Sequence, residues 1–195
     1  MGQLADLDAV TIDAMGTLVR LDTPVRRLAE AAGIDEGAAR RGFEAEVAYY
    51  LPRTLEGRDE ESLAALRERC AAVFSEAAGA TLDAARFMEA IVFEPQPGAF
   101  ESVRRLEARG LVLCVVSNWD CGLAEQLERL GLRLPVVTSA EAGAAKPDPA
   151  VFRLALERLG VAPERALHVG DSPSDERGAA EAGMRFAPAP LAALL

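Results

Sequence analysis

The sequence predicts an α/β protein with a doubly wound parallel sheet and a helical insertion. Two observations predict this class. From residue 98 onward, short apolar runs typical of strands alternate with amphipathic stripes typical of helices, and a similar apolar run, AVTIDAM, lies near the start at 9–15. Between these regions, residues 24–93 carry helical patterns without a strand signal. The 195 residues suit one α/β domain that carries an insertion.

The elements of the expected core follow in order along the chain. The first run predicts a buried strand that opens into a tight turn at Gly16 and Thr17. Apolar residues at helical spacing between the later runs predict helices that pack on the sheet. The later elements are a helix at 98–109 and strands at 111–116 (LVLCVV), 134–137 (LPVV) and 166–169 (ALHV).

The insertion is expected to hold roughly four helices. It is rich in Ala, Arg and Glu, and acidic residues at Asp59 and Asp83 are suited to helix starts. Breaks between the helices are expected at Gly33, Pro52, Gly57 and Gly79. We therefore expect a core domain of residues 1–22 and 95–195, and an inserted helical domain of residues 23–94.

Composition excludes some classes of partner. The net charge of −10 and the isoelectric point near 4.7 disfavour binding to nucleic acid and to anionic membranes, which need a basic surface. The first residues lack a signal-peptide pattern, and no apolar run approaches a membrane span. A cytoplasmic location is therefore expected, with Cys70, Cys114 and Cys121 reduced. The sequence does not indicate an oligomeric state.

Polar residues follow the ends of several expected strands. In a parallel sheet, ligands collect beyond the carboxyl ends of the strands, where Asp13, Ser117, Asn118 and Asp171 all lie. Lys146 follows the third strand and is the only lysine in the chain, against twenty arginines. Its compact ammonium suits a site shared by carboxylates and a phosphate. Simpler interpretations remain open, in which Asp13 is a cap, Ser117 and Asn118 are turn residues and Lys146 is a surface residue.

Asp171 and Asp175 lie four residues apart at the mouth of the last expected strand. Paired carboxylates are typical ligands of Mg²⁺, although Asp175 could instead cap a helix beginning near Glu176. His168, the only histidine, lies inside the preceding strand and is interpreted as a structural residue with a local hydrogen bond. With one histidine, neither a Ser-His-Asp mechanism nor a zinc site is expected.

Together, these motifs resemble the haloacid dehalogenase-like superfamily. The resemblance rests on their order: Asp13-Ala14-Met15-Gly16-Thr17-Leu18, then Ser117-Asn118, then Lys146-Pro147-Asp148-Pro149, then Gly170-Asp171 with Asp175. It spans nearly the whole chain. It implies a Rossmann-like core, with the inserted helices as the cap domain of that family.

The resemblance also implies a role for each motif. Asp13 is expected to form an aspartyl-phosphate with a small phosphorylated substrate, and Lys146 to neutralise charge between them. Mg²⁺ is the implied cofactor. The implied metal site consists of Asp13, the Met15 carbonyl, Asp171 and, in support, Asp175; the implied phosphate site consists of Met15, Gly16, Ser117, Asn118 and Lys146.

Met15 departs from the usual pattern, because phosphatases of the family carry a second Asp at this position. That Asp acts as general acid and base, a contribution of about 10²- to 10⁴-fold in rate, and a thioether cannot donate a proton. Three explanations stay open. The chain is a phosphohydrolase that acts slowly or on good leaving groups, a metal-independent 2-haloacid dehalogenase, or a binding protein without useful turnover. Asp171 and Asp175 favour the first, because dehalogenases of this group lack the acidic pair.

Overall fold

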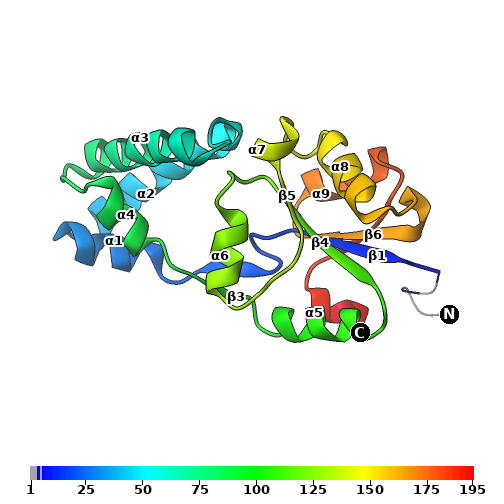
Figure 1. Ribbon diagram of the computed structural model, residues 1–195. Helices are drawn as coiled ribbons and strands as arrows, with labels where there is room; N and C mark the ends of the chain where they lie inside the picture. Colours follow the sequence, from blue (N-terminus) through cyan, green and yellow to red (C-terminus); the bar gives the residue numbers. More distant parts are fainter. Residues whose placement is uncertain (1–3, 5) are drawn as a thin grey trace. The chain divides into compact units, whose positions relative to one another are not determined.

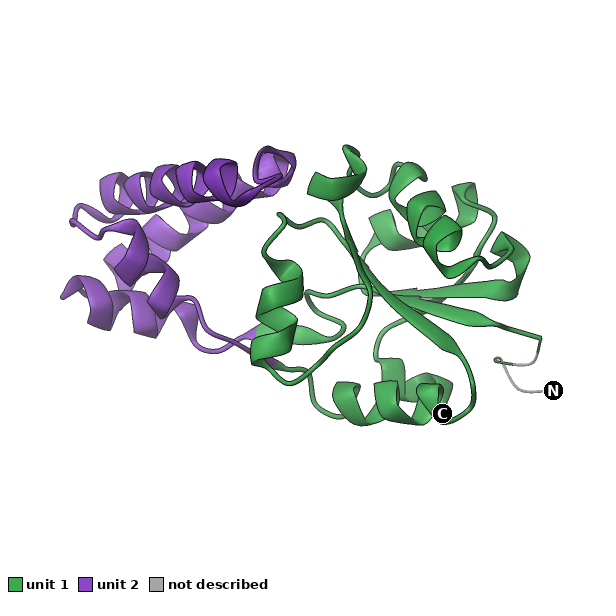
Figure 2. Cartoon of the chain, viewed as in Figure 1, with its two compact units in different colours: residues 1–20, 95–195 green, residues 21–94 purple. Residues whose placement is uncertain are grey.

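The computed structural model describes residue 4 and residues 6–195, which divide into two compact units. Unit 1 contains residues up to Arg20 together with Pro95–Leu195, and unit 2 contains Leu21–Glu94 (Figure 2). The chain therefore leaves unit 1 once, forms unit 2, and returns to complete unit 1.

Unit 1 is built on a five-stranded parallel sheet with the order β5-β4-β1-β6-β7. The first strand of the chain, β1, lies at the centre of the sheet, between β4 and β6 (Figure 1). The chain first extends the sheet on one side of β1 and then crosses to the other side, which creates a switch point where loops diverge. The strands are β1 (Ala9–Ile12), β4 (Val112–Ser117), β5 (Val136–Thr138), β6 (Ala166–Gly170) and β7 (Arg185–Pro188).

Helices cover both faces of this sheet, as expected for a doubly wound fold. On one face, α8 (Ala150–Leu159) and α9 (Pro173–Glu181) bury Val151, Phe152 and Ala179 against the strands. On the opposite face lies α5 (Ala99–Glu107), beside the C-terminal segment (Figure 1). The remaining helices of the unit are α6 (Leu123–Arg129), α7 (Ser139–Ala142) and the 3₁₀ turn η2 (Pro163–Arg165).

The C-terminal segment and a second, two-stranded sheet were not predicted from the sequence. The edge strand β7 and the 3₁₀ turn η3 (Leu191–Leu194) form the C-terminal segment, and η3 buries Leu191 and Leu194. Two further strands, β2 (Val19–Leu21) and β3 (Phe93–Pro95), pair as a separate two-stranded sheet. These strands carry the chain out of unit 1 and back.

Unit 2 is helical. It contains α1 (Pro24–Ala32), α2 (Glu36–Tyr50), α3 (Glu60–Ala78), α4 (Ala84–Ala90) and the 3₁₀ turn η1 (Leu51–Glu56). Asp59 and Asp83 cap α3 and α4 by accepting backbone N–H groups, as their acidic starts predicted. The helices α2 and α3 approach closely because Gly42 has no side chain; a Cβ there would lie 2.7 Å from the Phe74 ring.

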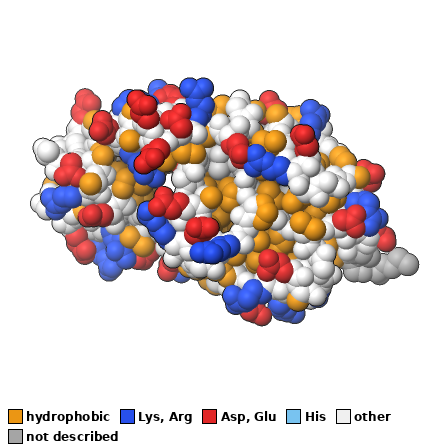
Figure 3. Space-filling view, viewed as in Figure 1, with side chains coloured by type: hydrophobic (Ala, Val, Ile, Leu, Met, Phe, Trp, Pro, Cys, Tyr) orange, Lys and Arg blue, Asp and Glu red, His pale blue; other side chains and the backbone are white. Residues whose placement is uncertain are grey.

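The described surface shows no strong segregation by charge on the face in view. Acidic and basic side chains are interspersed there (Figure 3). Within residue 4 and residues 6–195, no helix is both long enough and apolar enough to cross a bilayer.

Candidate active site

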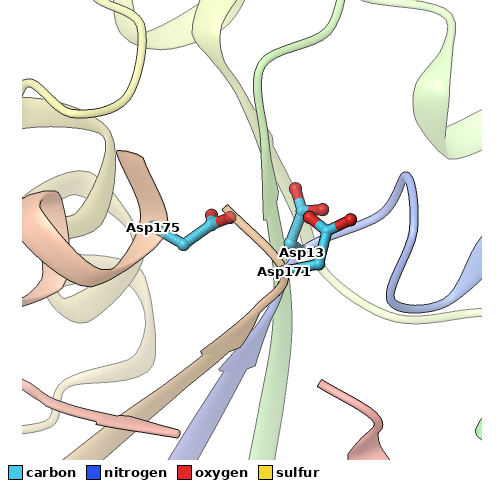
Figure 4. Close-up of side chains that lie close together, drawn as sticks. All are labelled: Asp13, Asp171 and Asp175. Carbon is cyan, nitrogen blue, oxygen red and sulfur yellow. The ribbon is translucent and has the colours of Figure 1, made fainter. Parts of the chain in front are cut away.

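Three carboxylates meet at the carboxyl edge of the sheet of unit 1. Asp13 follows β1 and extends its ladder by donating its backbone N–H to the Val169 carbonyl at 2.8 Å. Asp171 follows the adjacent strand β6, and Asp175 lies in the first turn of α9. Each offers a carboxylate oxygen within 4.8 Å of the others, and the Asp175 side chain points towards the other two (Figure 4). Parallel pairing of β1 and β6 thus brings together groups about 160 residues apart in sequence.

The turn after Asp13 makes room for Asp171. Gly16 has a φ of +83°, which favours glycine, and a Cβ there would lie only 1.9 Å from Asp171 Oδ2. The Ala14 carbonyl accepts the N–H groups of Leu18 and Val19 and closes the turn. The Gln96 amide donates to the Gly16 carbonyl at 3.0 Å. Any side chain at position 16 would therefore displace a member of the carboxylate cluster.

Lys146 lies between two of these carboxylates. Its ammonium Nζ donates to Asp13 Oδ1 at 2.5 Å, to Asp175 Oδ1 at 2.5 Å and to the Val116 carbonyl at 3.1 Å. An ammonium has three protons, so its donors are fully used. Burial alone would lower the pKa of Lys146, but the charges of Asp13 and Asp175 raise it above its ordinary value. Lys146 therefore acts as a fixed positive charge.

Asn118 holds the backbone of Lys146 in place. Its side-chain Nδ2 donates to the Lys146 carbonyl at 3.0 Å, and its Oδ1 accepts the Lys146 N–H at 2.6 Å. Ser117, the last residue of β4, donates its hydroxyl to Asp13 Oδ1 at 3.0 Å. In this structure Ser117 and Asn118 therefore act on Asp13 and Lys146; direct contact with a phosphoryl group stays a prediction.

Asp175 is surrounded by donors. Its Oδ1 accepts from Lys146 and from His168 Nε2 at 3.0 Å, and its Oδ2 accepts from the hydroxyl and the N–H of Ser172, at 2.5 and 3.1 Å. Burial opposes its ionisation, but the bonds to His168 and Lys146 hold the pKa of Asp175 well below its usual range. Ser172 is the N-cap of α9, so Asp175 is the third helical residue of a capping box rather than the cap itself.

The other two carboxylates are less well compensated. Burial raises the pKa of Asp13 more than Lys146 lowers it, and burial together with the charge of Asp175 raises the pKa of Asp171. Three carboxylates share one ammonium, which leaves an excess of negative charge beside hard oxygen atoms. This donor set fits Mg²⁺, which binds one or two carboxylates and completes its shell with water and substrate oxygens. Because Asp175 is already engaged, Asp13 and Asp171 are the better placed to contact the ion.

His168 is fully buried in β6, and both of its ring nitrogens have partners. Nε2 lies 3.0 Å from Asp175 Oδ1, and Nδ1 lies 2.8 Å from the hydroxyl of Thr11 on β1. Burial lowers the pKa of His168, which favours the neutral ring. The structural interpretation is confirmed, but its link to the carboxylate cluster was not predicted.

The structure brings together seven residues singled out from the sequence, because Gly16 adjoins Asp171 and Asn118 holds Lys146. Asp13 and Lys146 are bonded, and Ser117, Asp171 and Asp175 adjoin them. Met15 is 36% exposed and its thioether has no proton to donate, and its carbonyl as a metal ligand stays a prediction. Thr11 and Gln96 also support the site and were missed from the sequence. For Thr11, the available signal was a polar residue within an apolar strand, two positions before Asp13 and on the same face.

Comparison with known proteins decides the family. Residues 7–183 match the model of the haloacid dehalogenase-like hydrolases. The chain belongs to this family. It is 42% identical over 102 residues to mouse (Mus musculus) haloacid dehalogenase-like hydrolase domain-containing protein 3, a stretch covering 50% of this chain and 41% of that protein.

Two further relatives of this haloacid dehalogenase-like chain bear on its chemistry. Phosphoserine phosphatase of Thermus thermophilus is 39% identical over 140 residues, covering 64% of this chain and 56% of that protein. The chain thus matches only about half the length of these curated relatives. Among solved structures, L-2-haloacid dehalogenase of Xanthobacter autotrophicus aligns with a TM-score of 0.67 and 26% identity, covering 93% of this chain and 77% of the other.

Proposed function

We propose that this chain is a Mg²⁺-dependent phosphatase-like hydrolase that forms an aspartyl-phosphate on Asp13 with a small phosphorylated substrate. The observation that carries the proposal is the Lys146 ammonium within hydrogen-bond distance of Asp13, inside the cluster completed by Asp171 and Asp175. The relative named phosphoserine phosphatase supports the reaction class. A cytoplasmic location, favoured by three cysteines that form no disulfide, belongs to the same proposal.

In the first step, Asp13 attacks phosphorus. Ser117 and Lys146 both donate to Oδ1, and among the described residues Oδ2 accepts no hydrogen bond, so Oδ2 is the oxygen available to attack. The Oδ2–phosphorus bond forms as the bond from phosphorus to the leaving oxygen breaks. Lys146 offsets the negative charge that develops on the phosphoryl oxygens. Held by Asp13, Met15 and Asp171, Mg²⁺ would supply further charge neutralisation.

Met15 limits which leaving groups depart easily. Without an acid at this position, the leaving oxygen departs as an anion or takes its proton from water, which favours acyl phosphates and anhydrides over alkyl phosphates. Water then attacks the aspartyl-phosphate, releases inorganic phosphate and regenerates Asp13. Lys146 does not replace the missing acid, because its raised pKa keeps it protonated throughout.

The proposal is tested by measuring phosphate release from acyl phosphates and alkyl phosphates, with Mg²⁺ and with a chelator. We expect release only with Mg²⁺, faster for acyl phosphates, and a loss of more than about a thousandfold in Asp13→Asn. Absence of turnover for every phosphorylated substrate, in folded protein with Mg²⁺ present, would favour the binding-protein alternative and contradict this proposal.

A substitution at position 15 tests the account of the missing acid. Met15→Asp is expected to raise turnover of alkyl phosphates by up to about 10²-fold, because it restores a proton donor beside Asp13. Met15→Asn is the matched control, since it has similar size and no acid. An equal gain in both variants, or none in either, would show that proton donation at this position is not what limits the rate.

A second candidate function is dehalogenation of 2-haloacids. It is favoured by the absent acid at Met15, since halide leaves without a proton, and by the similarity to L-2-haloacid dehalogenase. Asp171 speaks against it, because a third carboxylate beside Asp13 repels the carboxylate of such a substrate unless a cation is bound. Halide release that persists with a chelator would favour this alternative.

A further inference from the structure

Thr11 and His168 occupy positions where apolar residues would cost less. They are paired across the adjacent strands β1 and β6, and both side chains are fully buried. The His168 ring packs edge-on against Phe152, with ring centroids 4.8 Å apart, and lies near Phe186. A buried polar side chain destabilises a core unless it is hydrogen-bonded, so its partners show what it does there.

The hydrogen bonds of His168 have a defined direction. Both oxygens of Asp175 already accept hydrogen bonds from Lys146 or Ser172, so Asp175 acts as an acceptor and His168 Nε2 carries the hydrogen that lies between them at 3.0 Å. A neutral ring then has an unprotonated Nδ1, which accepts the Thr11 hydroxyl proton at 2.8 Å. The Thr11 hydroxyl therefore satisfies the unprotonated Nδ1 of the tautomer that donates to Asp175.

These hydrogen bonds continue to Lys146 and Asp13, the proposed catalytic pair, and form a connected series. His168 donates to Asp175 Oδ1, the same oxygen that accepts from Lys146, and Lys146 donates to Asp13. Thr11 lies on β1 and Asp13 directly follows that strand, so the hydrogen-bonded series begins and ends within two residues of one segment. The Asp175 carboxylate that accepts from Lys146 is held by other donors as well, from His168 and from Ser172.

We propose that Thr11 and His168 are positioning residues: they hold the Asp175 carboxylate in the orientation that keeps the Lys146 ammonium against Asp13. The structural part of this proposal concerns the resting protein without metal. Its catalytic part rests on the proposed function, because it assumes that Lys146 must be held in place for Asp13 to attack.

The sequence makes the resting arrangement directly observable. Lys146 is the only lysine and His168 the only histidine, so untagged protein labelled with ¹⁵N-lysine and ¹⁵N-histidine gives one side-chain signal set for each. For metal-free wild-type protein we expect a neutral ring protonated at Nε2, and a Lys146 ammonium whose exchange with water is slow. A doubly protonated ring, or one protonated at Nδ1 alone, would overturn the proposal.

Two pairs of variants test whether Thr11 and His168 hold Lys146. In His168→Leu, which removes the donor, ammonium exchange is expected to quicken about tenfold or more, whereas His168→Gln keeps an amide donor and should restore slow exchange. Thr11→Val removes the hydroxyl at nearly constant volume, and Thr11→Ser retains it. If the leucine variant fails to fold, the valine variant tests the same series of hydrogen bonds. Unchanged ammonium exchange in folded Thr11→Val and His168→Leu would overturn the proposal.

Kinetics separate this proposal from the proposed function. In Thr11→Val and His168→Leu we expect kcat to fall about tenfold or more while KM stays within about threefold, with recovery in the serine and glutamine variants. If ammonium exchange quickens as expected but wild-type protein hydrolyses no phosphorylated substrate, the positioning proposal stands and the proposed function fails. If wild-type protein hydrolyses a phosphorylated substrate and the variants change neither ammonium exchange nor kcat, the positioning proposal fails and the proposed function stands.

Discussion

Replacing Lys146 with methionine removes the ammonium from between two buried carboxylates while keeping much of the side-chain volume. The lysine side chain is 3% exposed, and those of Asp13 and Asp175 are 7% and 0% exposed. Water therefore cannot take over the role of the ammonium. We expect Lys146→Met to be destabilised and to show a stability that depends on pH differently from the wild-type protein.

The magnitude follows from the groups left behind. Removing one partner of a buried ion pair costs about 3–5 kcal/mol. Two features place the expected cost near the lower end, about 3 kcal/mol: Asp175 keeps its bonds from His168 and Ser172, and Asp13 can become neutral by taking up a proton. For a chain of this length, such a loss lowers Tm by roughly 6–12 °C.

The pH dependence has a definite sign. Burial already raises the pKa of Asp13 above its ordinary value of 3.8, and loss of Lys146 raises this pKa further. The folded variant then holds a proton that the unfolded chain releases, so its stability increases as pH falls and decreases as pH rises through the folded pKa. The deficit relative to wild type is therefore expected to be smaller at about pH 5 than at about pH 8.

The assay is urea unfolding at both pH values with a chelator present, so that bound metal does not contribute. The control is the double variant Lys146→Met with Asp13→Asn, in which the uncompensated carboxylate is replaced by an amide of the same shape. The second substitution should recover about 1–2 kcal/mol of the loss, as the coupling term of a double-mutant cycle. Additive free energies, or an equal deficit at both pH values, would refute the reasoning.

Two further predictions concern the turn after β1 and the thiols. Gly16→Ala is expected to weaken Mg²⁺ binding about tenfold, measured by calorimetry, because its Cβ collides with Asp171. Gly131→Ala is the control, because Gly131 has nearly the same φ, +84° against +83°, but a Cβ there meets nothing within 4 Å. The control variant should bind Mg²⁺ as the wild-type protein does. Burial raises the pKa of Cys114 to about 12, so iodoacetamide at neutral pH should modify the half-buried Cys121 first. Mass spectrometry of the folded protein gives the order, and early labelling of Cys114 would contradict its burial.

Much of the parallel sheet could be predicted from the sequence, because central strands are nearly continuous apolar runs. The strands β1, β4 and β6 lie within the predicted runs or overlap them to within one residue at their ends. The strand predicted at 134–137 begins later, at Val136, after Pro135, which has no N–H to donate to a ladder. The edge strand β7 was missed because it has only four residues, of which one is buried.

Some contacts of the candidate site could likewise be predicted from the sequence, and others could not. The proximity of Asp13 and Asp171 could be predicted, because the carboxyl ends of adjacent parallel strands share one edge of a sheet. The proximity of Lys146 depends on a loop held by Asn118, and no periodic pattern encodes such a tertiary contact. The bond from His168 to Asp175 depends on how α9 begins, which spacing alone does not determine.

The paired strands β2 and β3 have a consequence for how such a chain can diversify. They join the two points where the polypeptide departs from unit 1 and rejoins it, and Asp22 and Val92 are already hydrogen-bonded backbone to backbone at 2.9 Å. A segment inserted between these paired strands has both ends already held close together, so it loses only its own loop-closure entropy, which grows slowly with length. Helices of another number or composition could therefore be exchanged at this junction while strand order, and with it the geometry of the acidic cluster, is inherited unchanged.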